Sequence, residues 1–271
     1  MTIRDALRAA RQLIDLLDAH VLLGDVLGVD RATLIANPEA TLTPEQTERF
    51  ARFMKRCAAG EPVAYILGRR AFYDRDFSVT PAVLIPRPET ELLLERALEW
   101  TGDRVLTAVD VGTGSGALAV TLAAKRPKIA VHAVDISPAA LTVARQNAQR
   151  YQVKVTFYEG DLLKPLIARA RRVDLVLANL PYIASDELPH LAVSHYEPRL
   201  ALDGGADGLV LIRRLLAQVP QVVNAGALVL LEIGAGQGDA ALTLVQQMLA
   251  PKRSELLLDY AGMDRIIQVQ L

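Results

Sequence analysis

The first third of the chain has the apolar spacing of α-helices. In the first predicted helix, apolar side chains recur three or four positions apart and follow a capping residue, Thr2; they are Ile3, Leu7, Ala10, Ile14 and Leu17. A short helix is predicted over residues 31–35, and a longer one begins after Thr43 and ends near Gly60. Gln46 can return a hydrogen bond to the Thr43 amide, which makes this start a capping box. We therefore expect a helical N-terminal domain over residues 1–71.

The pattern changes over residues 72–90. Phe77 and Val79 alternate with polar neighbours, which is typical of a strand, and the three prolines within 81–88 prevent a helix from continuing. We predict a short hairpin followed by an extended linker in this segment. An amphipathic helix then begins near Glu89.

From residue 91 to residue 271, short apolar runs alternate with helical patterns. The predicted strands are Leu106–Val111, Ala130–Val134, Val153–Tyr158, Leu175–Ala178, Ala227–Ile233 and Ile266–Val269. Helices are predicted between the first four strands, over Ala117–Lys125, Pro138–Tyr151 and Leu163–Arg171. Such alternation indicates an α/β fold, in which a parallel sheet carries helices on both faces.

Composition and charge narrow the class of protein. The 271 residues are 51% apolar, which is enough for a sizeable core, and the net charge of −1 lacks the basic excess usual in nucleic-acid-binding proteins. The lone Cys57 cannot form an internal disulfide, and residues 1–20 carry too many charges for a signal peptide. No apolar run reaches the ~18 residues that a membrane span needs. We therefore expect a cytoplasmic protein with no membrane partner.

A glycine-rich loop follows the first strand of the α/β region. Its residues are Gly112, Thr113, Gly114, Ser115 and Gly116, and it opens the next helix. Glycine is needed where a backbone turns tightly against a ligand, although a loop of this kind can also be a plain tight turn. The glycines stand two apart, unlike the G-x-G-x-x-G of dinucleotide-binding proteins, which favours a cofactor without a pyrophosphate.

Acidic residues follow the next two strands. Asp135 lies 19 residues after Gly116, where a carboxylate can accept hydrogen bonds from two ribose hydroxyls; its alternative role is to cap the following helix. Asp161 could bond an adenine amino group and Leu162 could pack on the ring, but a turn aspartate before a helix fits the spacing equally well. The strand ends of an open α/β sheet meet at one crevice, so these residues fit a single ligand site.

The fourth strand runs into Asn179, Leu180, Pro181 and Tyr182. A planar –NH2 nitrogen has a delocalised lone pair, and two acceptors in line with its hydrogens can direct that lone pair at an electrophile. The Asn179 side-chain oxygen and the Leu180 carbonyl can be these acceptors, because Pro181 favours an extended Leu180. Tyr182 can stack on the planar target. An isolated segment of this kind would more simply end a strand, but after a glycine loop it predicts transfer of a sulfonium methyl group to nitrogen, without a metal.

These motifs resemble those of class I S-adenosylmethionine-dependent methyltransferases, and the chain as a whole is similar to the release factor glutamine methyltransferase (HemK-like) family. The further segments that carry this resemblance are 60–68, 85–91, 197–202, 204–209 and 231–234. Two positions depart from the family pattern. Leu180 stands where the family usually has a first proline, and Leu162 stands where many relatives have an aromatic residue.

The resemblance implies a fold, a reaction and a set of residues. We expect a Rossmann-like, seven-stranded methyltransferase domain over 91–271, and a helical domain that helps to hold the protein substrate. The expected reaction is N5-methylation of the glutamine in the Gly-Gly-Gln motif of peptide chain release factors. The residues expected to contact S-adenosylmethionine are Gly112, Thr113, Gly114, Ser115, Gly116, Asp135, Asp161, Leu162 and Asn179. Those expected to hold the glutamine are Asn179, Leu180, Pro181, Tyr182 and Phe72, with Arg87 beside them and with Asn179 and Tyr182 as the catalytic pair.

Three other functions stay open at this point. A ribosomal-protein glutamine methyltransferase would share the Asn179–Tyr182 motif, although the 85–91 segment looks more like the release-factor branch. A DNA adenine-N6 methyltransferase uses the same logic, but only 89 residues follow Tyr182, and the first 72 residues hold ten basic and nine acidic groups. The third is a binding module that keeps the fold without turnover, against which the intact Asn179 and Tyr182 argue.

Overall fold

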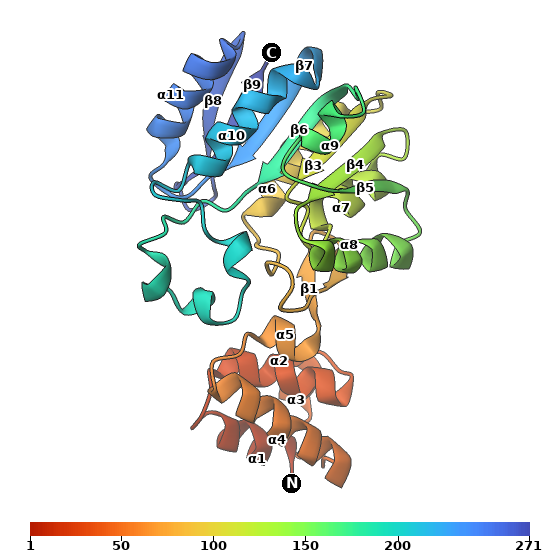
Figure 1. The fold of residues 1–271 in the computed structure, drawn as a ribbon. Coiled ribbons are helices and arrows are strands. Elements are labelled where there is room, and N and C mark those ends of the chain that lie inside the picture. Colours follow the sequence, from red (N-terminus) through yellow and green to blue (C-terminus); the bar gives the residue numbers. More distant parts are fainter. The chain divides into compact units, whose positions relative to one another are not determined.

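The computed structural model describes all 271 residues, Met1 to Leu271, and divides them into two compact units, Met1–Arg69 and Arg70–Leu271 (Figure 1). Each unit encloses a hydrophobic core of its own. Neither unit contains a helix with the length and apolar character needed to cross a membrane.

Five helices form the N-terminal unit: α1 (Ile3–Ala10), α2 (Leu16–Leu27), α3 (Arg31–Ala36), α4 (Pro44–Ala58) and α5 (Val63–Leu67). Their apolar faces pack around Leu22, Leu23 and Phe50, which are fully buried. The capping box predicted at the start of α4 is confirmed. The Thr43 hydroxyl accepts from the Gln46 amide at 3.2 Å, and Gln46 Oε1 accepts from the Thr43 amide at 2.9 Å.

The first predicted helix is two helices. α1 ends at Ala10, and α2 begins at Leu16, where the Asp15 carboxylate accepts a hydrogen bond from the Leu17 amide at 2.7 Å. Apolar residues continue at helical spacing across this break, but Leu13 and Leu17 are 63% and 55% exposed. The apolar periodicity therefore does not reveal the boundary between α1 and α2, which the N-cap residue Asp15 creates.

A hairpin opens the second unit. Its strands, β1 (Arg69–Phe72) and β2 (Arg75–Ser78), are joined by a turn in which Tyr73 has a φ of 59°. The hairpin begins earlier than the predicted segment 72–90. Phe72 and Phe77 are buried and meet edge to face, with their ring centroids 6.0 Å apart.

A seven-stranded sheet forms the centre of the second unit, with the strand order β5-β4-β3-β6-β7-β9-β8. Its strands are β3 (Thr107–Val111), β4 (Ala130–Asp135), β5 (Val155–Glu159), β6 (Val173–Asn179), β7 (Val223–Glu232), β8 (Arg253–Leu258) and β9 (Asp264–Gln270). The first five strands of this order are parallel, as predicted, whereas β9 runs antiparallel to both of its neighbours. The sheet is therefore mixed. The strand β8 is not among the predicted strands, because this edge strand has charged residues near its start and shows no clear alternation.

Helices cover both faces of the sheet, as the α/β pattern predicts (Figure 1). The helices α6 (Thr90–Thr101), α7 (Ala117–Lys125) and α8 (Pro138–Arg150) pack on one face. The helices α9 (Lys164–Ile167), α10 (Val210–Gln218) and α11 (Gly238–Leu249) pack on the other. The helix predicted over Leu163–Arg171 is only the four residues of α9, and Ala170 beyond it has a left-handed φ of 49°.

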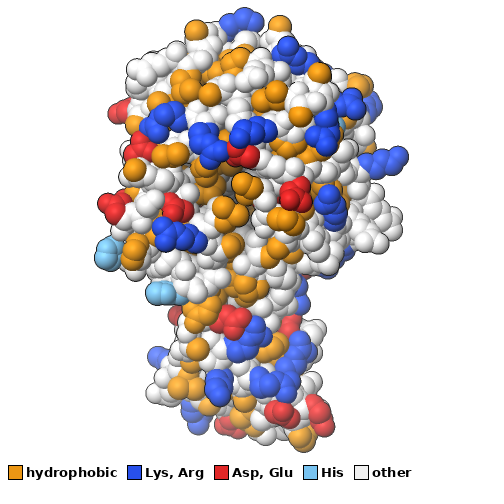
Figure 2. All heavy atoms as spheres, viewed as in Figure 1, with side chains coloured by type: hydrophobic (Ala, Val, Ile, Leu, Met, Phe, Trp, Pro, Cys, Tyr) orange, Lys and Arg blue, Asp and Glu red, His pale blue; other side chains and the backbone are white.

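Four short 3-10 turns complete the unit: η1 (Leu188–His190), η2 (Ala192–His195), η3 (Arg199–Ala201) and η4 (Val219–Gln221). The first three lie in the long connection between β6 and α10. On the face drawn in Figure 2, basic and acidic side chains are interspersed. This mixture fits the nearly balanced charge of the chain.

Candidate active site

A cavity opens at the carboxyl ends of the parallel strands β3, β4 and β6, with the segment that follows β5 beside them. It is the place where open α/β sheets bind ligands, next to the point where strand order reverses about β3. Most of the predicted site residues line it: Phe72, Gly112, Thr113, Gly114, Ser115, Asp135, Asp161, Leu162, Asn179, Leu180 and Pro181. Gly116 and Tyr182 are not part of this lining.

The glycine loop joins β3 to α7 with a left-handed backbone. The φ angles of Gly112, Gly114 and Gly116 are 74°, 55° and 82°, a region that only glycine adopts readily. A Cβ on Gly112 would lie 3.0 Å from the Leu180 side chain, so the loop and the Asn179–Tyr182 segment are packed together. A Cβ on Gly116 would lie 3.2 Å from Ala144 Cβ, so this glycine allows α8 to approach and faces away from the cavity.

Two buried side chains support the glycine loop. Asp110, the residue before the last in β3, accepts from the Thr113 hydroxyl at 2.6 Å, and burial raises the pKa of its carboxyl to about 7. Asn147 of α8 donates to the Ser115 carbonyl at 2.8 Å, and its Oδ1 and Nδ2 bond the backbone N–H and C=O of Ser78 at 2.8 and 3.0 Å. The loop is thus tied both to its own strand and to the hairpin.

Asp135 ends β4 inside the cavity. Its Oδ2 accepts from the Gly114 amide at 2.8 Å and its Oδ1 accepts from the Ser137 amide at 2.9 Å. Burial raises the pKa of this carboxyl, against the effect of these amides. The helix after it is capped by the Ser137 hydroxyl, which accepts from the Ala140 amide at 3.2 Å. Asp135 is therefore not the capping residue, and each of its oxygens keeps a lone pair for a ligand.

Asp161 and Leu162 lie on the wall next to β5. The Asp161 carboxylate accepts from Lys164 Nζ at 2.8 Å and from Arg214 Nη2 at 2.6 Å. Partial burial opposes ionisation, but these two cations outweigh it and lower the Asp161 pKa. Leu162 is buried with a φ of 52°, which is unusual for a residue with a side chain. Its side chain turns into the core and the cavity wall rather than into solvent.

The Asn179–Pro181 segment forms the wall next to β6. Asn179 is the last residue of β6, and its Nδ2 donates to the Thr90 hydroxyl of α6 at 3.0 Å. The side-chain oxygen of Asn179 is thereby turned away from Thr90. Leu180 is buried, and Pro181 continues the wall.

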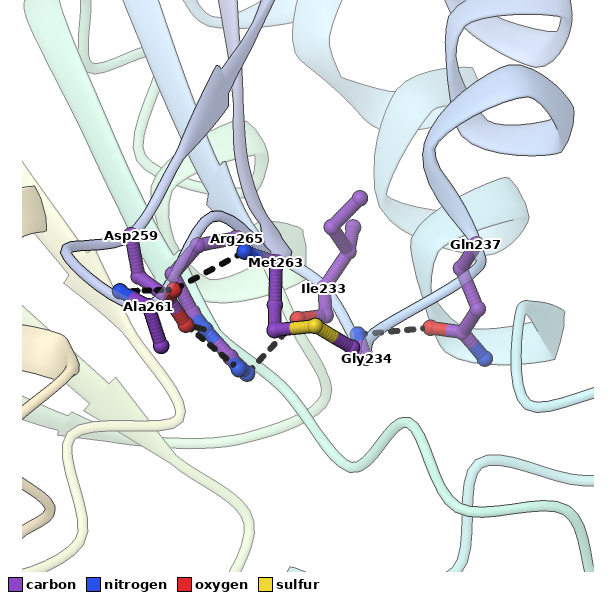
Figure 3. A network of polar contacts seen from close by, with 7 residues as sticks. All are labelled: Ile233, Gly234, Gln237, Asp259, Ala261, Met263 and Arg265. Atoms are coloured by element: carbon purple, nitrogen blue, oxygen red, sulfur yellow. Dashed lines mark hydrogen bonds and ion pairs between the residues drawn. The ribbon is translucent and has the colours of Figure 1, made fainter.

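Tyr182 lies behind this wall. Its backbone carbonyl accepts from Gln237 Nε2 at 2.9 Å, while Gln237 Oε1 accepts from the Gly234 amide at 2.8 Å. Burial raises the pKa of the Tyr182 phenol to about 12. Figure 3 shows the Gln237–Gly234 contact beside Arg265, whose guanidinium is held by Asp259 and donates to the Ile233 carbonyl at 3.3 Å.

Two distant sequence segments meet at the cavity mouth. Arg87 of the 85–91 segment pairs with Glu197, which is only 4% exposed and also accepts from the Ile85 amide at 3.0 Å. Arg87 lines the cavity, together with Pro198 and Leu200 from the second segment. The 85–91 and 197–202 segments are therefore joined by an ion pair between a buried glutamate and a partly exposed arginine.

Three buried residues near the site were not predicted to have a role. These residues lie inside the motif segments of the sequence, without a spacing that marks them individually: Asp110, Thr90 and Glu232. A carboxylate in an apolar run, as in the 227–233 strand, is the signal that could have identified Glu232, because such groups are buried only at a cost.

Comparison with known proteins assigns both parts of the chain. Residues 2–68 match the PrmC N-terminal domain family, and residues 88–195 match the methyltransferase small domain family. Solved structures share the fold at low identity. The Thermus thermophilus 16S rRNA N2 G1207 methyltransferase aligns with a TM-score of 0.55 at 18% identity, covering 74% of this chain and 50% of its own. The catalytic domain of human Mettl16 aligns with a TM-score of 0.57 at 12% identity, covering 81% of each chain.

Curated relatives are similar over nearly the whole length. A release factor glutamine methyltransferase from Moorella thermoacetica is 44% identical over 98% of this chain and 97% of its own length. One from Bacillus subtilis is 40% identical over 92% of this chain and 89% of its own length. Such identity over both units shows the family, so the chain belongs to the release factor glutamine methyltransferases.

Proposed function

We propose that this enzyme transfers a methyl group from S-adenosylmethionine to the side-chain amide nitrogen, N5, of the glutamine in the Gly-Gly-Gln motif of peptide chain release factors. The observation that carries this proposal is the Asn179 amide at the end of β6. Its Nδ2 is bonded to Thr90 at 3.0 Å, and its oxygen is left to accept from a planar –NH2 group. The family membership supports the same substrate.

The cavity residues fit S-adenosylmethionine. The left-handed backbone of Gly114 borders open space, because a Cβ built on Gly114 would have only the Gly112 carbonyl oxygen near it, at 4.0 Å. Asp135 retains an acceptor position on each oxygen for a ribose diol. Apolar side chains of Leu162 and Ile136 line the wall where a flat adenine ring would pack, with Asp161 beside them. When bound, S-adenosylmethionine supplies an electrophilic methyl carbon on a sulfonium sulfur.

The chain orients the amide nitrogen that receives the methyl group. Asn179 Oδ1 and the Leu180 carbonyl accept its two hydrogens, which turns its lone pair out of conjugation and toward the methyl carbon. With S-adenosylmethionine bound, its methyl group would pass from sulfur to this nitrogen, and the nitrogen would then lose one hydrogen as a proton to water. No charged base is needed at the nitrogen.

The proposal extends to the rest of the chain. The helical region, residues 1–71, would help to hold the release factor, the segment 72–90 would be its connection, and residues 91–271 would form the catalytic domain. Phe72, Arg87 and Tyr182 would complete the glutamine site, Tyr182 by supporting the Pro181 wall. A release factor is a cytoplasmic substrate, so the enzyme would act in the cytoplasm without a nucleic acid or membrane partner.

Methyl transfer from labelled S-adenosylmethionine to a purified release factor tests this function. The matched control is the same factor with its Gly-Gly-Gln glutamine changed to alanine. We expect label on the unaltered factor and none on the control. Label on both factors would contradict the target residue. Label on neither, with transfer to a ribosomal protein or to DNA instead, would contradict the substrate.

A further inference from the structure

A buried carboxyl group lies directly behind the Asn179 wall. Glu232 ends β7 and is 1% exposed, and no hydrogen bond of standard geometry reaches either of its side-chain oxygens. Its polar neighbours are the hydroxyls of Thr90 and Tyr182. Burial raises its pKa to about 7, while the Thr90 hydroxyl, Arg265 and the Tyr182 hydroxyl act in the opposite direction and Glu89 adds to the rise. A group buried in this way is costly, so its presence beside a reaction centre points to a role there.

The register of the sheet brings Glu232 to the asparagine. Asn179 and Glu232 are paired across β6 and β7, as the last residues of both strands. Thr90, at the start of α6, is a neighbour of both residues. Its hydroxyl accepts from Asn179 Nδ2 at 3.0 Å, and the same hydroxyl lowers the pKa of the Glu232 carboxyl. Asparagine, threonine and glutamate therefore form one cluster.

The direction of the threonine hydroxyl decides which way the asparagine amide faces. A hydroxyl has one hydrogen and can accept from Asn179 Nδ2 only when that hydrogen points elsewhere. If the hydrogen pointed at Asn179, the amide would be stabilised in the flipped orientation, with Nδ2 toward the substrate. Two –NH2 groups would then face each other, and the substrate nitrogen would lose an acceptor.

We propose that Glu232, acting through Thr90, is a positioning residue that holds the Asn179 oxygen toward the substrate amide. In this relay the hydrogen of the Thr90 hydroxyl points toward the Glu232 carboxyl, the hydroxyl oxygen accepts from Asn179 Nδ2, and Asn179 Oδ1 is left for the glutamine. Either ionisation state of Glu232 has an acceptor oxygen for this purpose. The identity of the substrate in this inference rests on the proposed function. The orientation of the Asn179 amide does not depend on it.

Paired variants of Thr90 test the relay by kinetics. Thr90→Val keeps the shape and removes the hydroxyl, and we expect kcat to fall ~100-fold, the scale of a misoriented catalytic group, with little change in the Kd for S-adenosylmethionine. Thr90→Ser restores the hydroxyl and should return kcat to within a few-fold of the original enzyme. Thr121→Val is the matched control, because Thr121 is also buried in a helix but has no hydrogen-bond partner. It should leave kcat unchanged.

Variants of Glu232 test the carboxyl end of the relay from Glu232 through Thr90 to Asn179. Glu232→Gln keeps an acceptor oxygen and should retain most of kcat, whereas Glu232→Leu removes it and should lose as much as Thr90→Val. The double variant Thr90→Val/Glu232→Leu should lose no more than either single variant, because all three break one relay. Losses that multiply, or equal losses in Glu232→Gln and Glu232→Leu, would overturn the proposal.

A measurement on the free enzyme separates this inference from the proposed function. Hydrogen exchange of the Asn179 side-chain amide, followed by 15N NMR, should be slow in the original enzyme and in Thr90→Ser. It should be at least ~10-fold faster in Thr90→Val and Glu232→Leu, because the bonded hydrogen is released. Equal exchange in all four proteins would overturn the relay, whatever the enzyme methylates. Failure to label any release factor, with the expected exchange pattern intact, would count against the proposed substrate alone.

Discussion

Asn179 and Asp135 stand at the ends of β6 and β4, the two strands that flank β3. Both are held by neutral neighbours: Thr90 for the asparagine, and the amides of Gly114 and Ser137 for the aspartate. Neither takes part in an ion pair, so each keeps polar atoms for a ligand. In contrast, Asp161 is already paired with two cations.

Replacing Asn179 with alanine should remove turnover while leaving the fold intact. The side chain is at a strand end and touches a cavity, so its loss leaves no closed void in the core. We expect kcat to fall by ~100- to 1,000-fold, the scale found when one preorganised polar group is removed from an active site. Steady-state methyl transfer and far-UV circular dichroism check this together. Turnover close to that of the original enzyme would contradict the orienting role.

Replacing Asp135 with asparagine should weaken cofactor binding. A carboxylate–hydroxyl hydrogen bond contributes about 1.5–3 kcal/mol, so the Kd for S-adenosylmethionine should rise by ~10- to 100-fold. Isothermal titration calorimetry measures it directly. At saturating cofactor, kcat should recover most of its original value, since Asp135 does not contact the glutamine. An unchanged Kd would rule out the ribose role.

At the scale of elements, a glycine-rich turn supports the Asn179–Tyr182 segment from behind. A Cβ on Gly204 would lie 2.8 Å from the Pro181 carbonyl oxygen, and a Cβ on Gly208 would lie 2.3 Å from the Tyr182 carbonyl oxygen. Such distances are shorter than van der Waals contact. Gly204 and Gly208 are therefore glycines because the backbone of this segment touches the backbone of Pro181 and Tyr182.

Gly204→Ala should displace the Asn179–Tyr182 segment without unfolding the protein. The φ of Gly204 is not left-handed, so the effect is steric, and the Pro181 wall must move by several tenths of an ångström. We expect a ~10-fold or larger fall in kcat. Gly226→Ala is the control, with a φ of 78° but open space around its Cβ, so it should lose about 1–2 kcal/mol of stability and little activity. Similar kcat values for both variants would contradict the steric role.

The elements also show what the sequence could and could not predict. The strands β3, β4 and β6 were predicted because buried parallel strands are continuous apolar runs. The edge strand β8 was missed because none of its residues is fully buried and apolar and polar residues do not alternate along it. The break between α1 and α2 was missed because apolar spacing continues across the Asp15 cap. The cavity residues were predicted from motifs at strand ends, whereas Thr90 and Glu232 depend on a helix packing against a strand far along the chain.

At the scale of the whole molecule, two buried carboxyl groups make stability depend on pH. The pKa values of Asp110 and Glu232 are each raised to about 7, from ordinary values of 3.8 and 4.5. Between the unfolded and folded pKa values the native state binds more protons than the unfolded chain. The free energy of unfolding therefore falls as pH rises from about 4.5 to 7, and levels off above that range.

Glu232→Gln should make this pH dependence shallower. A pKa shift of this size in one carboxyl corresponds to a loss of stability on the order of 3 kcal/mol once the group is ionised. The neutral amide of glutamine does not ionise, so the variant avoids this loss at high pH. We expect the variant to gain Tm relative to the original protein at pH 8 and much less at pH 5. Glu99→Gln, at an exposed glutamate on α6, is the control and should shift neither. Parallel melting curves for Glu232→Gln and the original protein across this range would contradict the raised pKa.

The Asn147 side chain has a consequence for the hairpin as well as for the glycine loop. The backbone of Ser78, at the end of the hairpin, and the carbonyl of Ser115, in the glycine loop, both hydrogen-bond the buried side-chain amide of Asn147. If the hairpin or the loop moves away with Asn147, the other one loses its hydrogen bonds to this amide. Coupling of this kind is reciprocal. A cofactor that binds better when the hairpin is closed will shift the opening equilibrium of the hairpin toward the closed form. A partner that binds only the open hairpin will weaken cofactor binding by the same factor by which the cofactor weakens binding of that partner.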